Sequence, residues 1–203
     1  MKKNVFFVSL LVMMTILGAC GKEDVPDKPT GNATEKSIES SSDYEIFASE
    51  SSTVQVGSDK VAREEYSSDW SEDWRGLITK INKVVIVELS DDYVESEGLT
   101  SKYVTQVYFS LENSSEEDFN TFPDQSTLVI AGQQIDSAFN SDDIGGEIMG
   151  GVTKEGIITY EIEKPINVSD VKEIRIKWSA HKESETYEAE DYKEYDVRLD
   201  LSH

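Results

Sequence analysis

An alternation of apolar and polar residues with a period of two runs through the chain from about Trp70 onward. This period places successive side chains on opposite faces of an extended backbone, so it predicts β-strands. No segment carries a long apolar pattern of period 3.6, and we therefore expect no helix in the main core. The clearest strand segments are residues 81–89, 103–113, 127–131, 157–162, 171–178 and 195–201.

The spacing of these segments predicts the fold class. About seven strands in roughly 130 residues, separated by turn-rich stretches, are typical of an all-β antiparallel β-sandwich. A domain of this length buries enough surface to be stable without a disulfide. We assign it to residues 69–203, with inward faces that include Val107, Phe109, Leu111, Ile174, Ile176 and Trp178.

The N-terminus has the pattern of an export signal. Two lysines, Lys2 and Lys3, precede an almost wholly apolar run over residues 5–19. As a helix this run would measure about 22 Å, which is shorter than the ~30 Å hydrocarbon core of a bilayer. That length favours a cleaved signal peptide over a transmembrane helix. The signal peptide is assigned to residues 1–19.

The end of this run is Leu17-Gly18-Ala19-Cys20, which resembles the lipobox of bacterial prolipoproteins. The resemblance implies cleavage between Ala19 and Cys20 and attachment of diacylglycerol to the Cys20 thiol. Cys20 is the only cysteine in the chain, so it has no partner for an internal disulfide. A secretory signal with an accidental cysteine and an uncleaved anchor helix are the alternatives.

Residues 20–68 are rich in Ser, Glu, Asp, Lys and Thr. Such a composition buries too little apolar area to offset the entropy of ordering, so it predicts a flexible linker. The alternative for the short apolar groups at residues 44–47 and 54–56 is that they pair as strands or dock on the domain.

The chain is strongly acidic. Without residues 1–19 it has 17 basic and 41 acidic residues, a formal charge of −24. This charge repels nucleic acid and anionic lipid headgroups, so neither is an expected direct partner. Among the 19 basic residues 15 are lysine, a bias that indicates a low-GC Gram-positive source.

Two stretches of the domain resemble uncharacterised immunoglobulin-like domains of Gram-positive lipoproteins. They are residues 107–122, which contain Val-Tyr-Phe-Ser-Leu-Glu-Asn and a Phe-containing loop, and residues 150–178, which contain Gly-Gly-Val-Thr-Lys-Glu-Gly. The resemblance implies a telokin-like, immunoglobulin-like sandwich comparable to that of the mycobacterial immunoprotective extracellular protein. It covers about residues 75–180 and brings no catalytic residues.

Candidates for catalysis are few. The only histidines are His181 and His203, and a lipidated Cys20 is not available as a nucleophile. Paired carboxylates, as in an envelope hydrolase, remain an alternative, although 41 acidic residues make close pairs commonplace. We therefore expect no enzyme activity and no cofactor.

Acidic loops raise the alternative of a calcium or small-ligand binder. Asp142 and Asp143 with Glu147, and the pair Asp91 and Asp92, supply hard oxygen ligands, yet neither group has the spacing of an EF-hand. Asx-rich turns have the same appearance without a metal, so no metal site is assigned.

Two tryptophans, Trp70 and Trp74, stand four residues apart. In a helical turn they would share one side and could form an aromatic platform, and the alternative is that they close the end of the sandwich core. The sequence as a whole predicts a non-enzymatic interaction protein. We expect it to be held on the extracytoplasmic face of the cell membrane through Cys20 and to bind an envelope or secreted protein.

Overall fold

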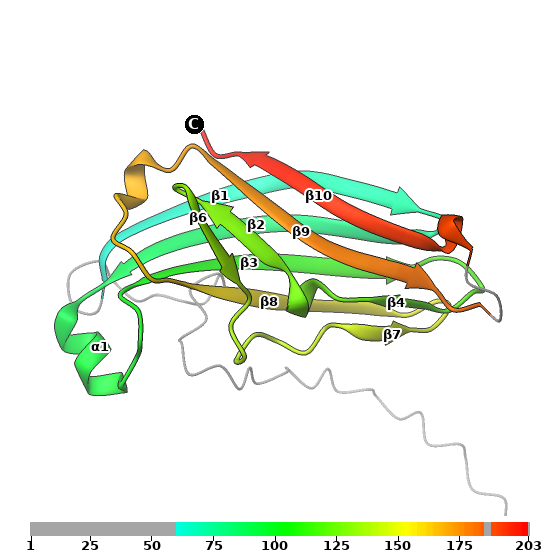
Figure 1. The fold of residues 1–203 in the computed structure, drawn as a ribbon, viewed down its shortest axis with the longest axis horizontal. Coiled ribbons are helices and arrows are strands. Elements are labelled where there is room, and N and C mark those ends of the chain that lie inside the picture. The colour runs from blue at the N-terminus through cyan, green and yellow to red at the C-terminus, as the bar shows by residue number, and fades with distance from the viewer. Residues whose placement is uncertain (1–59, 185–187, 203) are drawn as a thin grey trace, which may run out of the picture. The chain divides into compact units, whose positions relative to one another are not determined.

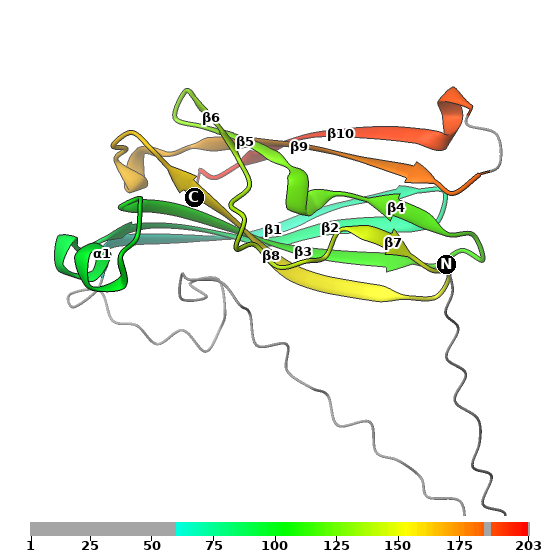
Figure 2. The same ribbon diagram turned by 60° about the horizontal axis from the view of Figure 1, so that its bottom comes forward.

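Two antiparallel β-sheets pack face to face in the computed structural model, which describes residues 60–184 and 188–202 (Figures 1 and 2). One sheet has the strand order β1-β2-β3-β8, and the other has the order β6-β5-β9-β4-β7 with β10 paired to the free side of β9. The elements are β1 (Lys60–Trp74), β2 (Leu77–Leu89), α1 (Asp91–Glu97), β3 (Tyr103–Asn113), β4 (Phe119–Thr121), η1 (Pro123–Gln125), β5 (Thr127–Ile130), β6 (Gln133–Asp136), β7 (Gly146–Ile148), β8 (Thr153–Ile162), η2 (Val168–Asp170), β9 (Glu173–Lys182), η3 (Ala189–Asp191) and β10 (Tyr192–Asp200).

The predicted all-β antiparallel sandwich is confirmed, with ten strands where about seven were predicted. Two of the additional strands, β4 and β7, have three residues each, too few to show a period in the sequence. No helix in the described part of the chain is long and apolar enough to cross a membrane. The residues of the predicted lipobox lie outside the described residues; they are Leu17, Gly18, Ala19 and Cys20.

The predicted boundary of the linker is wrong where the structure describes it, because residues 60–68 belong to strand β1. β1 is an edge strand that pairs only with β2, so its outward side chains face water and can be charged. Its inward side chains, Ala62, Tyr66 and Trp70, contact the core. The polar outward residues give this strand the composition of a linker.

The space between the sheets is filled by a group of aromatic rings. Trp178 stacks on Tyr195 with ring centroids 4.5 Å apart, and both come from the six-stranded sheet. From the other sheet, Phe109 and Trp70 meet Trp178 edge-on at 5.3 and 5.8 Å. Trp74 likewise packs on Phe119 at 5.4 Å, so the tryptophans close the core as one prediction had it, but from a strand and not from a helical turn.

A second, smaller apolar cluster lies on the outer face of the four-stranded sheet, beneath helix α1. The helix begins at Ser90, whose hydroxyl accepts a hydrogen bond from the backbone N–H of Tyr93, and ends at Gly98 in the left-handed conformation. Asp91 and Asp92 lie in its first turn, where the helix dipole favours negative charge. Their predicted position on a loop was therefore wrong, because a seven-residue helix is too short to show a helical period.

The free edge of β8 is covered by the segment that joins β6 to β7. Asp142 accepts a hydrogen bond from the backbone N–H of Ile157 through its carboxylate, at 2.8 Å, and donates its own N–H to the Ile157 carbonyl. Ser141 accepts in the same way from Thr159. The outer face of the four-stranded sheet and one of its edges are thus partly covered.

Candidate binding groove

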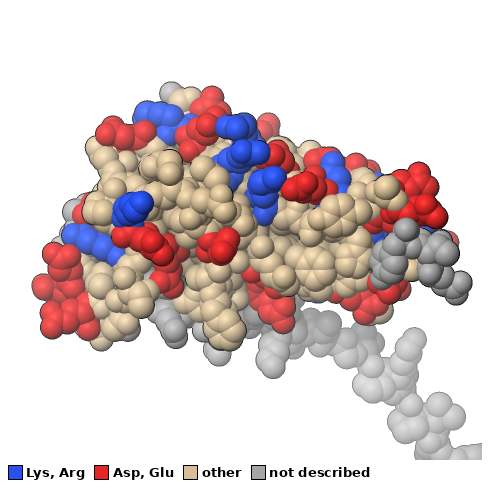
Figure 3. All heavy atoms as spheres, viewed as in Figure 1, with Lys and Arg blue, Asp and Glu red and all other residues tan. Residues whose placement is uncertain are grey.

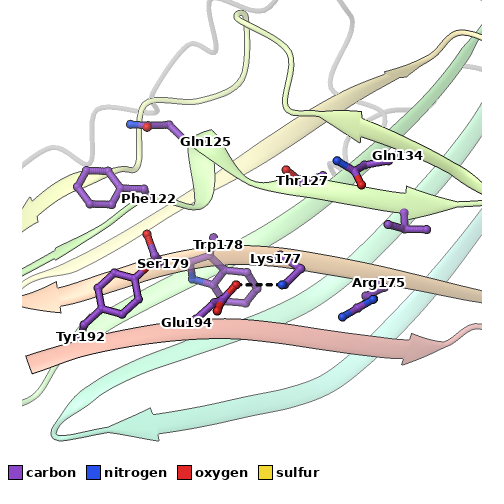
Figure 4. Close-up of a pocket in the computed structure, with 11 residues that line it drawn as sticks. Phe122, Gln125, Thr127, Gln134, Arg175, Lys177, Trp178, Ser179, Tyr192 and Glu194 are labelled. Atoms are coloured by element: carbon purple, nitrogen blue, oxygen red, sulfur yellow. Dashed lines mark ion pairs between the residues drawn. The ribbon is translucent and has the colours of Figure 1, made fainter. Parts of the chain in front are cut away.

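A groove of about 720 Å³ lies on the outer face of the six-stranded sheet (Figure 4). Its volume is within the range of about 300–1,000 Å³ that is usual for small-molecule sites. Strands β5, β6, β9 and β10 form it together with the β4–β5 connection. It is lined by Phe122, Gln125, Thr127, Val129, Gln134, Arg175, Lys177, Trp178, Ser179, Tyr192 and Glu194.

Strand register brings these side chains together. Successive residues of β9 alternate between the core and the groove, so Ile174, Ile176 and Trp178 point inward as predicted while Arg175, Lys177 and Ser179 point outward. On one side Thr127 of β5 lies opposite Lys177, and on the other Glu194 of β10 lies opposite Ser179. The floor therefore combines residues that are far apart in the sequence.

The tight turn between β5 and β6 places Gln134 in the groove. Ala131 and Gly132 both have positive φ, at 47° and 74°, as a two-residue hairpin turn of type I′ requires. The turn therefore uses Ala131 and Gly132, and β6 begins at Gln133. Gln134 lies opposite Val129 and is exposed.

The charges of the groove are paired. The Lys177 ammonium lies 2.9 Å from the Glu194 carboxylate, and the Arg175 guanidinium donates two hydrogen bonds to Asp196. These hydrogen bonds hold the pKa of the Asp196 carboxyl below its ordinary value. In the space-filling view, basic side chains gather over this part of the face with acidic ones beside them, and an uncharged area extends toward β4 (Figure 3).

One end of the groove is aromatic. The Phe122 ring packs against the His181 ring with centroids 5.8 Å apart, and His181 lies opposite Tyr192 in the β9–β10 ladder. The position of Phe122 is fixed because its N–H donates to the Ser179 carbonyl, at 3.0 Å. Tyr192 is 56% exposed, which is unusual for so large a ring. Figure 4 shows Phe122 and Tyr192 at the same end, away from Gln134 and Arg175.

Several polar groups of the groove have no partner within the part of the chain that the structure describes. They are the side-chain amides of Gln125 and Gln134 and the hydroxyl of Ser179. An amide offers two N–H donors and one acceptor, and a hydroxyl offers both functions. These groups are therefore available to a polar ligand.

The residues singled out in the sequence mostly lie elsewhere. His181 borders the aromatic end of the groove, whereas His203 and Cys20 lie outside the described residues. The Asp142 carboxylate is engaged by the β8 backbone. Across residues 60–184 and 188–202, no three His, Cys, Asp or Glu side chains are grouped as metal ligands would be.

One carboxyl outside the lining of the groove has an altered acidity. Burial raises the pKa of Asp124, and the nearby charge of Asp143 acts in the same direction. Asp124 packs directly over Gly145, where an added Cβ would lie 1.9 Å from its Oδ1 atom. The glycine is thus required for this close approach.

The groove was not predicted from the sequence, although the charges of its residues indicated part of it. The outward residues Arg175 and Lys177 on one strand and Asp196 on another have opposite charges, which favours their being neighbours. Nothing comparable marks Phe122 or Gln125, because both come from the short β4–η1 stretch between recognisable strands.

No protein-family model and no curated protein matches the chain. Eight chains of solved structures resemble it, and three of them are the following. A functionally unknown protein from Listeria monocytogenes has a TM-score of 0.47 and 17% identity, over 70% of this chain and 87% of the other. A candidate lipoprotein (ycdA) from Bacillus subtilis has a TM-score of 0.40 and 13% identity, over 64% of this chain and 39% of the other.

The third is a conserved hypothetical protein from Bacillus anthracis with a TM-score of 0.40 and 15% identity, over 57% of this chain and 91% of the other. Similarities this low carry no argument about function. The neighbours thus include a candidate lipoprotein and uncharacterised Gram-positive proteins. None is named as immunoglobulin-like or telokin-like, so that part of the resemblance stays a prediction.

The ion pair between Arg175 and Asp196 generates a pH prediction. Because the folded pKa of Asp196 is lowered, the pair stabilises the fold above the ordinary Asp pKa of about 3.9, and this contribution is lost as the pH falls through the folded pKa. In Arg175→Gln we expect the Asp196 pKa to rise toward its ordinary value. An NMR pH titration of the side-chain carboxyl measures it.

The matched control is Lys80→Gln, which removes a lysine paired with Glu112 on the other sheet. It should leave the Asp196 titration unchanged. An Asp196 pKa that does not move in Arg175→Gln would show that the guanidinium is not the cause of the shift.

Proposed function

We propose that the chain is a lipid-anchored protein of the extracytoplasmic membrane face that binds a ligand in the groove of its six-stranded sheet without catalysing a reaction. The observation that carries the proposal is the groove itself. It combines the exposed Tyr192 ring and the partly buried Phe122 ring with unpartnered amides on a face that no other described element covers. Such a combination favours recognition of a ligand.

The sequence supports the anchor. Leu17-Gly18-Ala19-Cys20 has the order of a lipobox, and lipidation accounts for the single thiol of the chain. A diacylglycerol contributes two buried acyl chains at about 0.8 kcal/mol per methylene, which gives stable attachment where one chain is marginal. An anchored domain has its groove facing the envelope or the medium.

The charges of the groove support binding without chemistry. A general acid or base needs a pKa near the working pH and a proton that it can give or take. Glu194 is paired with Lys177, and Arg175 holds the pKa of the Asp196 carboxyl below its ordinary value, so Asp196 is kept in the ionised form. An ionised carboxylate already engaged by a cation is poorly suited to proton transfer.

The groove is tested by filling it. In Ser179→Arg a long side chain replaces a small one on the floor, at a position that points away from the core. In a Cys20→Ser background, which has no acyl chain that would itself bind the membrane, we expect Ser179→Arg to lower the affinity of the complete chain for isolated cell envelopes about tenfold, measured by co-sedimentation. The control is Ser96→Arg, an exposed position on α1 beside the other sheet. Equal retention of the two variants would exclude the groove as the binding surface.

The anchor is tested by removing the thiol. We expect Cys20→Ser to move the protein from the membrane fraction to the medium or to a soluble fraction, because no acyl chain can be attached. Immunoblots of fractionated cells measure the distribution, and mass spectrometry measures the modification. Ser41→Ala, in the linker, is the control and should remain in the membrane fraction. Membrane retention of the Cys20→Ser protein would contradict the lipid anchor.

A further inference from the structure

We propose that the groove binds a linear glycan of uncharged sugars. The inference rests on the proposed function, since it names the ligand class of the same groove. Three properties of the groove carry it, namely its aromatic end, its balanced charge and its unpartnered hydrogen-bonding groups.

The aromatic end provides surfaces for sugar rings. The C–H face of a pyranose is apolar while its hydroxyls lie around the rim, so it packs on a flat aromatic side chain with its polar groups still hydrated. Tyr192 is more than half exposed, and Phe122 lies at the same end with its ring against His181 (Figure 4). Phe122 directly follows β4, His181 lies on β9, and Tyr192 lies opposite His181 on β10.

The charge of the groove disfavours an anionic polymer. Lys177 and Arg175 are each bound to a carboxylate, so a phosphate or carboxylate ligand would have to displace Glu194 or Asp196. The whole chain has a formal charge of −22, which adds long-range repulsion. A ligand without charge leaves the ion pairs intact.

The polar groups of the groove match hydroxyl and acetamido groups. The amides of Gln125 and Gln134 and the hydroxyl of Ser179 can each donate and accept, as the hydroxyls of a sugar do. A protein strand cannot pair with the floor of the groove, because adding a strand requires an open sheet edge. The β9 floor is paired with β10 on one side and with β5 and β4 on the other.

The groove is longer than one sugar. From Arg175 to Ser179 it follows five residues of β9, four steps of ~3.3 Å or about 13 Å, with the aromatic end beyond. A single pyranose would occupy only part of this length. A chain of several linked sugars can contact the aromatic end and the amides together.

The test is calorimetric titration of the complete chain with three hexamers. One contains β-1,4-linked N-acetylglucosamine, one contains β-1,4-linked glucose, and one contains the carboxylated sugar galacturonic acid. We expect at least one uncharged hexamer to bind and the galacturonate hexamer to bind at least tenfold more weakly. Phe122→Ala with Tyr192→Ala should weaken binding of the uncharged hexamer at least tenfold, while Tyr192→Phe, which keeps the ring, should retain it.

The control for loss of an exposed aromatic residue is Phe139→Ala, a fully exposed position outside the groove, which should bind as the unsubstituted chain does. Unfolding curves of every variant identify a loss that comes from misfolding, and Tyr192→Ala alone then provides the binding test. Unchanged affinity in the double variant, or equal affinity for the galacturonate hexamer, would overturn the proposal.

The outcomes separate the two levels of the account. If no hexamer binds while Ser179→Arg still reduces binding to envelopes, the glycan proposal fails and the groove keeps its function. If Ser179→Arg has no effect on envelope binding, the proposed function fails as well.

Discussion

The stacking of Trp178 on Tyr195 is the contact on which the rest of the arrangement depends. It joins β9 to β10 and presents the pair of rings to Trp70 and Phe109 of the opposite sheet. Because side chains alternate across a strand, fixing these inward residues also fixes the outward ones. Ser179 and Glu194, which each adjoin a stacked ring in the sequence, are thereby held in the groove. The floor of the groove is therefore formed by paired strands, and the β4–β5 connection adds Phe122 and Gln125 to its lining.

The charge of the groove differs from that of the chain as a whole. The chain has 41 acidic and 19 basic residues, so acidic residues are in large excess. In the groove, by contrast, the cations Arg175 and Lys177 each face a carboxylate across the β9–β10 ladder. Pairs of this kind contribute little to stability when exposed, but their opposite formal charges cancel. An uncharged ligand leaves these pairs intact, whereas a polyanion would have to displace a carboxylate.

The sequence predicted the strands in which apolar residues recur with a period of two. It did not predict the elements that are too short or too polar to show such a period. Strands β3 and β9 were placed closely, because apolar and polar residues alternate in their sequences; β9 buries alternate residues, whereas β3 is buried at most positions. Residues 60–68 of strand β1 were assigned to the linker, since an edge strand buries few side chains. Helix α1 is too short to show a period. The groove was not predicted, because Phe122 and Tyr192 are far apart in the sequence. Phe122 packs on His181, and strand register places His181 opposite Tyr192.

The central claim is that the outer face of the six-stranded sheet is the binding surface. Chemical-shift mapping by NMR tests it most directly, with the isotope-labelled complete chain and the N-acetylglucosamine or glucose hexamer that binds. The account predicts that the largest shifts fall on the backbone amides of Phe122, Ser179 and Tyr192. Val85 and Val104, in the cluster beneath α1, should not shift. Shifts confined to that cluster, with none in the groove, would contradict the account.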